Sequence, residues 1–561
     1  MRLVAAILRW RLRIGAKILR ERDARLAVGV GFLLVFGAVM VGEYLFFSRS
    51  FRAVADLGVA APPLTLYALE AFFALILVIG ILSAVVTGST VFFRVAENRL
   101  FLASPMPLRT LFVLRSVETF VLTSWAFVLL AAPALLALGG HHDRAAGFYL
   151  VAAGLLLAFL VLAGALGMLL TMAFGALLGH FRSRLGIVGL TVALLVAAGL
   201  LVGRSVVPTR ADFNTMFEPG LLNGTTIALH FVEDKFAAWP SHAFAASIFG
   251  LATGRGSHPG RALATSLVLP LAAAAASYWV GGALFRRVVW RAAEGVLLAR
   301  PEGAATPPLG WRSFPVLLRG PVGALLEKEL VTVARNPQEL GRGGFFAFLL
   351  ALYTLLFLRV PVPDRAGTEA ISAQLVAFSI LATGYFLTTV ALRFVFPALS
   401  LEGRAAWILF ASPAPLVPLF WARLGLYAAG GFLGLGGIAL AGAARLGLSP
   451  LGFALFAGLL ALMSLTIMTV ALALGVCWPD FRGRSAEALA TSAGGLLTSA
   501  LCLGYVAVTG WLGYRLVLAL LTGGPPARIA APVVAGAVVS VAVAAGPLWL
   551  ARRRRASFEV R

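Results

Sequence analysis

Long apolar runs recur along the whole chain, each bounded by charged residues or by proline and glycine. A helix of about 20 apolar residues spans the hydrocarbon core of a bilayer. The pattern therefore predicts an all-α, polytopic membrane protein with twelve transmembrane helices in two similar six-helix halves. The expected spans are 26–47, 66–93, 111–139, 147–178, 186–204, 263–284, 344–361, 373–393, 416–441, 451–477, 486–509 and 529–550.

Composition and charge support a membrane protein. Hydrophobic residues make up 60% of the chain and charged residues 12%, which is too apolar for a soluble domain. The 46 Lys and Arg residues outnumber the 23 Asp and Glu residues, and they gather near residues 2–25, 286–342 and 552–561. Short loops rich in Lys and Arg stay in the cytoplasm. We therefore expect a bacterial-type inner (plasma) membrane location, cytoplasmic N- and C-termini, and no nucleic-acid partner.

Three segments outside the apolar runs organise the chain into domains. Residues 1–25 predict a basic amphipathic helix on the inner leaflet, and the stretch ALLEKELVTVARNPQEL predicts a second entry helix. The Pro- and Gly-rich stretch before it has no helical periodicity and is typical of a linker. The expected domains are a first six-span unit at 1–297, a cytoplasmic linker at 298–321 and a second six-span unit at 322–561.

An internal repeat supports the two units. Residues 103–115 (ASPMPLRTLFVLR) and 411–423 (ASPAPLVPLFWAR) agree at eight of thirteen positions, including an arginine that closes each copy. Glu97-Asn98-Arg99 and Glu402-Gly403-Arg404 precede the copies, and the sequences FRSR and FRGR follow them at 181–184 and 481–484. Chance similarity at membrane borders is the alternative to duplication of a six-span unit.

The loop after the second span combines charge with a Ser-Pro turn. Pro105 and Pro107 remove backbone donors and turn the chain, and Ser104 is expected to cap the helix that follows. The loop predicts a short cytoplasmic helix, with a twin at residues 402–415. A simple chain reversal at the lipid surface is the alternative.

This layout resembles the permease subunits of type-2 ABC exporters, which carry an entry helix, six spans and a coupling element after the second span. The resemblance implies outward movement of a substrate, coupled to two copies of a separate ATP-binding cassette ATPase subunit. It also implies that ATP and Mg²⁺ lie on that partner and that the chain itself is no enzyme and binds no cofactor or metal. The sequence has no G-x-x-x-x-G-K-[ST] phosphate loop. The implied coupling residues are Glu97, Arg99, Ser104, Pro105, Arg109, Glu402, Arg404, Ser412 and Pro413.

The segment between residues 205 and 260 is expected on the outer side. Trp239-Pro240-Ser241 predicts the start of a short apolar helix. The resemblance implies an outer-leaflet exit segment marked by Trp239, Pro240 and His242. An ordinary interfacial loop with an aromatic anchor is the equal alternative.

Few ionisable residues fall in the spans. Arg115 and Glu118 are spaced i, i+3 and predict a structural ion pair. Glu43 and Glu70 are expected near the outer surface, where solvation accounts for them. His141, His142 and Asp143 form a weak metal candidate that we interpret as loop.

The spans carry many Gly, Ala and Phe residues, which mildly favours a hydrophobic or lipid-like substrate. A twelve-span secondary transporter is one alternative function, but it needs buried charges or broken helices at the membrane midplane. A membrane-embedded lipid-processing enzyme is another, but it needs clustered Asp, Glu or His at one membrane face. The sequence is poor in both features.

Overall fold

The structure is a computed structural model, which describes part of the chain. The described residues are 23–56, 58, 61–93, 97–178, 197, 199, 201–203, 205–206, 224–255, 259–293, 323, 354, 369–406, 416–445, 448–481, 489–490 and 492–558. Several predicted features lie outside them: most of the helix at 1–25, the linker at 298–321, the second entry helix, the span 344–361 apart from residue 354, most of the span 186–204, the FRSR and FRGR sequences apart from Phe481, and the residues Ser412 and Pro413.

Every regular element in the described part of the chain is helical, and none is a strand. Eight of these helices are long and apolar enough to cross a membrane. A ninth candidate, Leu108–His141, is bent by 48° between Trp125 and Phe127. The predicted all-α fold is confirmed for the described residues, and the candidate spans are compatible with a membrane protein. Twelve spans in two six-helix halves stay a prediction, because the described residues do not contain that many.

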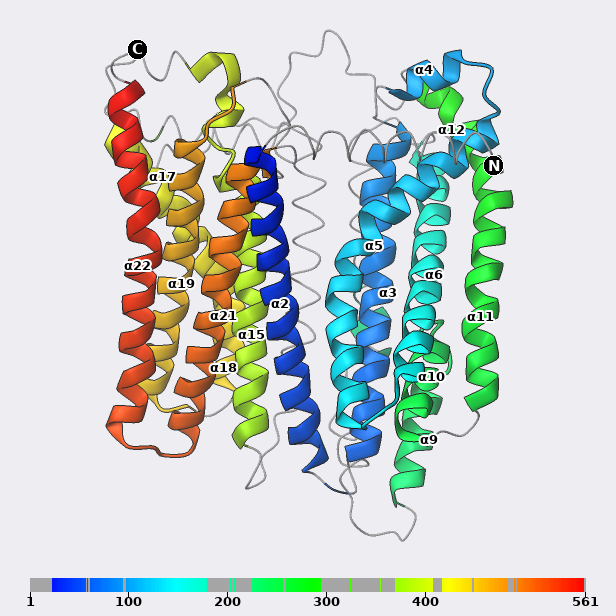
Figure 1. Ribbon diagram of the computed structural model, residues 1–561, viewed down its shortest axis with the longest axis horizontal. Helices are drawn as coiled ribbons and strands as arrows, with labels where there is room; N and C mark the ends of the chain where they lie inside the picture. Colours follow the sequence, from blue (N-terminus) through cyan, green and yellow to red (C-terminus); the bar gives the residue numbers. More distant parts are fainter. Residues whose placement is uncertain are drawn as a thin grey trace. The chain divides into compact units, whose positions relative to one another are not determined.

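The described helices fall into two compact units, with α2 (Asp23–Ala55) divided between them after residue 42. Among the described residues, the first unit contains eight further α-helices, which Figure 1 shows in the colours from blue to green. They are α3 (Ala61–Phe93), α4 (Glu97–Ala103), α5 (Leu108–His141), α6 (Ala146–Leu178), α9 (Gly224–Phe236), α10 (His242–Thr253), α11 (Pro259–Ala276) and α12 (Gly282–Ala293), the last two joined by the π-helical turn η2 (Ser277–Gly281).

Helix α3 packs against α5, α6, α9 and α10, and it shares the centre of the first unit with α6. Its buried residues include Leu66, Phe73 and Leu77, which form one apolar core with residues of α6 and α10. The rings of Phe73 and Phe159 meet edge to face at 5.0 Å between centroids. In this unit α4 and α12 lie at one end of the bundle, and α9 and α10 at the other (Figure 1).

The second unit is built on two central helices, α19 and α21, which pack on each other and on α15 and α22. Gly475 of α19 allows a close approach of Phe396, which follows α15 and a π-helical turn, because a Cβ atom at Gly475 would overlap the carbonyl oxygen of Phe396. Small residues at helix crossings let membrane helices approach in this way. The elements are α15 (Glu369–Val390), η4 (Ala391–Val395), η5 (Ser400–Ala405), α17 (Leu416–Gly431), η6 (Phe432–Gly436), α18 (Gly437–Ala444), α19 (Pro450–Cys477), α21 (Ala493–Leu521) and α22 (Pro526–Phe558).

Candidate functional site

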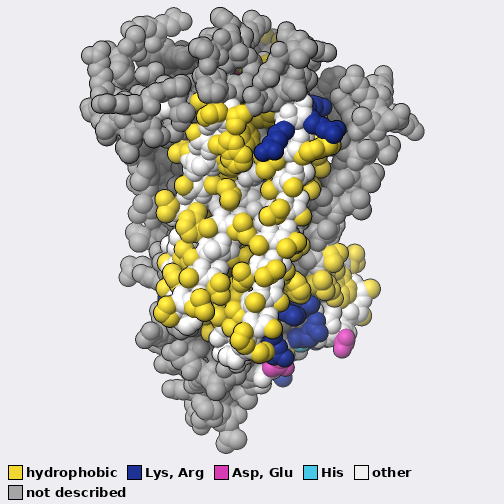
Figure 2. All heavy atoms as spheres, turned by 90° about the vertical axis from the view of Figure 1, so that its left-hand side faces the viewer, with side chains coloured by type: hydrophobic (Ala, Val, Ile, Leu, Met, Phe, Trp, Pro, Cys, Tyr) yellow, Lys and Arg dark blue, Asp and Glu magenta, His cyan; other side chains and the backbone are white. Residues whose placement is uncertain are grey.

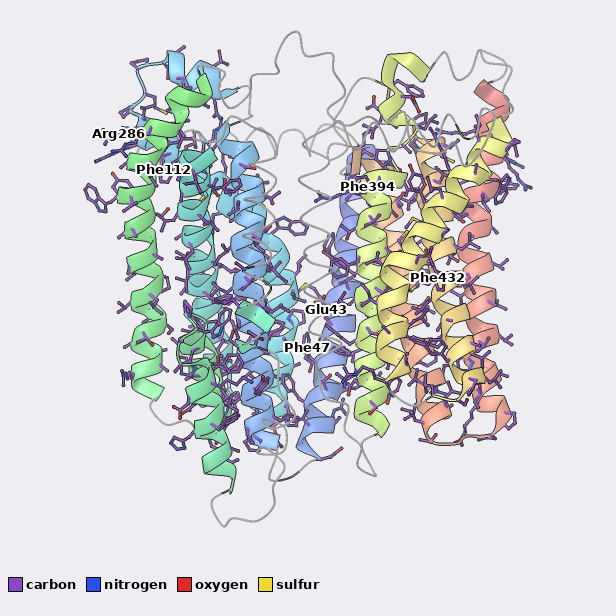
Figure 3. The ribbon with its side chains drawn as sticks, turned by 180° about the vertical axis from the view of Figure 1, so that it is seen from behind. Glu43, Phe47, Phe112, Arg286, Phe394 and Phe432 are labelled. Atoms are coloured by element: carbon purple, nitrogen blue, oxygen red, sulfur yellow. The ribbon has the colours of Figure 1, made fainter. Side chains whose placement is uncertain are left out.

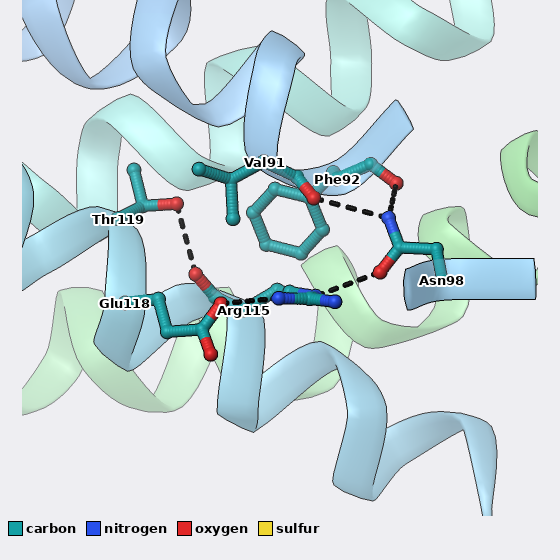
Figure 4. Close-up of polar contacts among 6 residues, drawn as sticks. All are labelled: Val91, Phe92, Asn98, Arg115, Glu118 and Thr119. Atoms are coloured by element: carbon teal, nitrogen blue, oxygen red, sulfur yellow. Dashed lines mark hydrogen bonds and ion pairs between the residues drawn. The ribbon is translucent and has the colours of Figure 1, made fainter. Parts of the chain in front are cut away.

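A buried arginine organises the end of the first unit that carries α4. Arg115 lies two turns inside α5 and is 1% exposed. Its Nε donates a hydrogen bond to Oδ1 of Asn98 at 2.7 Å, and one of its terminal nitrogens pairs with the Glu118 carboxylate at 2.5 Å (Figure 4). The predicted Arg115–Glu118 ion pair is therefore confirmed. A guanidinium has donors on one plane, so a single arginine can hold both partners.

Asn98 joins this arginine to two helices. Its Nδ2 donates to the carbonyl oxygens of Val91 at 3.1 Å and Phe92 at 2.9 Å, which belong to the last turn of α3. These carbonyls have no partner inside α3, and a side-chain donor satisfies them. Asn98 is thus the C-terminal cap of α3 and the point at which Arg115 of α5 holds α4.

Aromatic packing closes the same end of the unit. The Arg115 guanidinium lies 5.4 Å from the ring centre of Phe101 in α4. Phe112, one turn before Arg115, packs with Phe92 of α3 and Phe285 of α12 at centroid distances of 5.5 and 5.7 Å. Figure 3 shows Phe112 near Arg286 at this end of the bundle. The short helix α4 is therefore fixed to α3 and α5, and its Phe101 packs against the same apolar cluster.

The second unit repeats the arrangement with different partners. Arg423 is the repeat counterpart of Arg115 and is 6% exposed. It pairs with the carboxylate of Glu402 in η5 at 3.0 Å. The backbone N–H of Asp480 donates to Ser400 Oγ at 3.1 Å, which holds the start of η5 to the end of α19. In each unit a buried arginine of the following helix bonds back to the short charged element.

The sequence repeat contained both arginines and both charged triplets, but it did not predict these bonds. Asn98 follows Glu97 in its triplet, whereas Glu402 occupies the first position of its own. The arginine therefore bonds an amide in one unit and a carboxylate in the other. The Arg115–Asn98 contact had one signal in the sequence, a polar residue between two charged ones before an apolar helix.

Other predicted coupling residues have separate roles. Ser104 Oγ donates to the carbonyl oxygen of Phe101 at 2.7 Å, and Pro107 occupies the N-cap of α5 without a side-chain bond. The prediction that Ser104 caps the next helix is wrong, because its hydroxyl terminates α4 instead. The Arg109 guanidinium lies 5.2 Å from the ring centre of the Trp279 side chain in η2.

The structure describes the side chains of some of the remaining coupling candidates and only the backbone of others. Pro105 is exposed. The backbones of Glu97, Arg99 and Arg404 lie in α4 and η5, and their side chains are outside the described set, as are Ser412 and Pro413 entirely.

A second polar cluster lies at the opposite end of the first unit. Glu70 of α3 is 0% exposed, and its Oε1 lies 2.7 Å from Nδ1 of His242 at the start of α10. The expectation that solvation accounts for Glu70 is wrong, because α10 covers the carboxylate and supplies its partner. The short helix predicted after Trp239-Pro240-Ser241 is confirmed as α10, with Ser241 at its N-cap.

Several groups around this pair set its electrostatics. Burial favours the neutral form of His242, but its hydrogen bond to Glu70 and the charges of Glu70 and Glu233 outweigh burial and raise the pKa of His242 above 6.5. Next to the pair, Tyr67 donates to the carbonyl oxygen of Val206 at 2.8 Å. Trp239 is half-buried against the same apolar core, and Pro240 is exposed.

The histidine pair at the end of α5 is a separate feature. His141 stacks on Phe51 at 6.3 Å between ring centres and meets His142 edge to face at 5.0 Å. Among the described residues, no group of three His, Cys, Asp or Glu side chains could hold a metal ion. These histidines are therefore packed as rings at the turn between α5 and α6.

One family of known proteins matches the chain. Its model, described as a putative ATP-binding cassette, matches residues 22–523. Neither the curated proteins nor the solved structures contain a match.

The family match overturns four expectations drawn from the resemblance. The matching family is described as an ATP-binding cassette, so the identification with permease subunits of type-2 ABC exporters is wrong. The function expected from it, a permease coupled to a separate ATPase, is contradicted for the same reason. The family's description implies ATP and Mg²⁺ on this chain, which contradicts a non-enzymatic chain whose nucleotide lies on a partner.

The residues present do not fit the implied nucleotide. Cassettes of this class hold phosphates in a glycine-rich loop that ends in Gly-Lys-Ser/Thr between a strand and a helix. The lysines here are Lys17, Lys235 and Lys328, and none follows a glycine. The described residues form no strand that could present such a loop. Membership itself rests on the length of the match: the chain belongs to the family described as a putative ATP-binding cassette.

Proposed function

We propose that this chain is a membrane-embedded component of ATP-binding cassette transport machinery, and that α4 and the segment 400–415 bind another protein of that machinery. One observation carries the proposal. In each unit a buried arginine, Arg115 or Arg423, bonds the short charged element that precedes its own helix. Membership of the family supports the assignment to ATP-binding cassette machinery. The eight apolar helices support a location in the membrane.

The buried arginines indicate that α4 and the segment 400–415 are binding elements and not simple reversals of the chain. Removing a guanidinium from water is costly, and a turn that only reverses the chain needs no such group. What the arginines add is position, because each ties a short element to a long helix. A pre-positioned element binds a partner with less loss of conformational entropy.

Each short element also exposes an apolar side chain at its surface. Leu100 of α4 is 74% exposed, and Leu401 of η5 is 53% exposed. An apolar side chain among charged residues suits a partner groove with a polar rim. We assign Glu97, Arg99 and Arg404 to that rim, and Asn98 and Glu402 to positioning.

The finer parts of the proposal rest on the sequence. They comprise twelve spans in units 1–297 and 322–561, an inner-membrane location with both termini in the cytoplasm, and an outer-side segment that contains Trp239, Pro240 and His242. In this topology α4 and the segment 400–415 face the cytoplasm. The partner we propose at them is an ATP-binding cassette ATPase subunit, one copy at each.

Site-specific photo-crosslinking tests the proposal. A photoreactive residue in place of Leu100 or Leu401, in the full chain in native membranes, should crosslink to a protein that mass spectrometry identifies as a cassette ATPase. The matched control is Leu150, which is 79% exposed at the opposite end of the first unit and should give no such product. Equal crosslinking from all three positions, or crosslinks to lipid alone, would exclude α4 and η5 as binding elements.

A further inference from the structure

The C-terminal end of α22 combines arginine and tryptophan side chains. Four consecutive arginines, 552–555, follow the apolar part of the helix, and Arg552, Arg553 and Arg554 are exposed. Trp549 is 52% exposed one turn earlier. The Arg553 guanidinium lies 3.8 Å from the centre of the Trp549 ring, within the range of a cation–π contact.

Arg554 differs from its neighbours because the protein holds it. Its guanidinium lies 5.6 Å from the Trp478 ring and donates to the carbonyl oxygen of Cys477, at the end of α19. That carbonyl is one of those a helix end leaves without an internal partner. Arg554 therefore fastens α22 to α19, while Arg552 and Arg553 extend from the fastened end.

The helix below these arginines has the surface of a lipid-facing span. Val534, Val538, Val541 and Leu550 of α22 are all exposed. On the face turned to the viewer in Figure 2, hydrophobic side chains cover a broad middle band, and Lys and Arg side chains lie near its upper and lower ends. Tryptophan and arginine at the edge of such a band lie at the level of lipid headgroups.

We propose that Arg552 and Arg553, with Trp549, form a binding site for the headgroup of an anionic phospholipid. A guanidinium binds phosphate oxygens through two parallel hydrogen bonds, and Trp549 fixes one of the two guanidinium groups. The exposed valines of α22 continue from this site along the helix and offer contact to acyl chains. This continuity selects a lipid rather than a soluble phosphate, because a soluble ion uses none of that apolar surface.

Native mass spectrometry of the purified full chain tests the site. The probe is a mixture of phosphatidylglycerol and phosphatidylcholine added to the protein in detergent. The wild type should retain the anionic lipid in preference to the zwitterionic one. The double variant Arg552→Gln/Arg553→Gln should bind phosphatidylglycerol roughly tenfold or more weakly, since each basic side chain near a bilayer contributes about 1 kcal/mol.

Arg528→Gln is the matched control, because Arg528 is exposed on the first turn of the same helix at its other end. This control should retain the anionic lipid as the wild type does. A second variant, Arg552→Lys/Arg553→Lys, keeps both charges and should retain more anionic lipid than the glutamine variant. Equal retention of both lipids by the wild type, equal loss in the Arg528 control, or full displacement by inorganic phosphate would overturn the proposal.

Discussion

Replacing Arg115 by glutamine is the strongest test of the buried cluster in the first unit. The substitution removes the donor to Asn98 and the positive partner of Glu118, and both contacts lie in the interior of the protein. Asn98 keeps its bonds to the carbonyl oxygens of Val91 and Phe92. We therefore expect α3 to stay capped while α4 loses its attachment to α5.

The magnitude follows from the burial of the pair. Removing one member of a buried ion pair costs about 3–5 kcal/mol, because its partner is left without a counter-charge in a poorly solvated place. One kcal/mol lowers the melting temperature of a domain of this size by about 2–4 °C. The apparent melting temperature of the variant should therefore fall by about 6 °C or more.

Two measurements on the purified full chain read out this effect. Thermal unfolding in detergent reports the loss of stability, and hydrogen exchange of residues 97–103 reports the release of α4. The matched control is Arg109→Gln, an exposed arginine of the same helix whose Trp279 contact contributes about 1 kcal/mol or less. Arg115→Lys should lie between the two, because an ammonium lacks the planar fork that reaches both partners.

Two results would contradict this prediction. If Arg115→Gln and Arg109→Gln lower the melting temperature equally, the buried contacts add nothing to stability. If Arg115→Gln lowers it while exchange of 97–103 is unchanged, the arginine stabilises the helix bundle without positioning α4.

Three further predictions concern other parts of the molecule. Arg423→Gln should destabilise the second unit by about 3 kcal/mol, as measured by thermal unfolding. The exchanged pair Arg423→Glu/Glu402→Arg should recover part of the lost stability, and no recovery would argue against a direct ion pair. The pKa of His242 is raised in the folded protein, so the bond between His242 and Glu70 stabilises the protein fully below about pH 6.5. This stabilisation is lost as the pH rises through the raised pKa of His242. The variant His242→Gln should therefore show a flatter curve of stability against pH in that range. Gly475→Ala should lower the melting temperature, because its Cβ meets a backbone oxygen, whereas Gly458→Ala on the same helix meets nothing within 4 Å and should not lower it. An equal rise in both variants would show that the higher helix propensity of alanine outweighs packing.

The sequence alone determined the class of the protein and the position of most described helices. Helices satisfy their own backbone hydrogen bonds in lipid, so apolar runs of span length predict helices there, and seven of the eight candidate spans of the structure overlap closely with the predicted ranges. The exception is the predicted span 486–509, which the structure places at Ala493–Leu521. The Arg115–Glu118 pair was also predictable, because residues three apart on a helix are neighbours. Local spacing decides each of these features.

Contacts between distant parts of the chain required the tertiary structure. Glu70 and His242 are 172 positions apart, and neither residue carries a sign of the other. The sequence placed Glu70 at a solvated surface because it could not show that α10 folds back over α3. The arginine partners Asn98 and Glu402 were hidden for a related reason, since their distance from the arginine depends on how the chain turns between two helices. Only packing decides which polar groups share the interior, because a buried charge takes whichever partner the fold brings within reach.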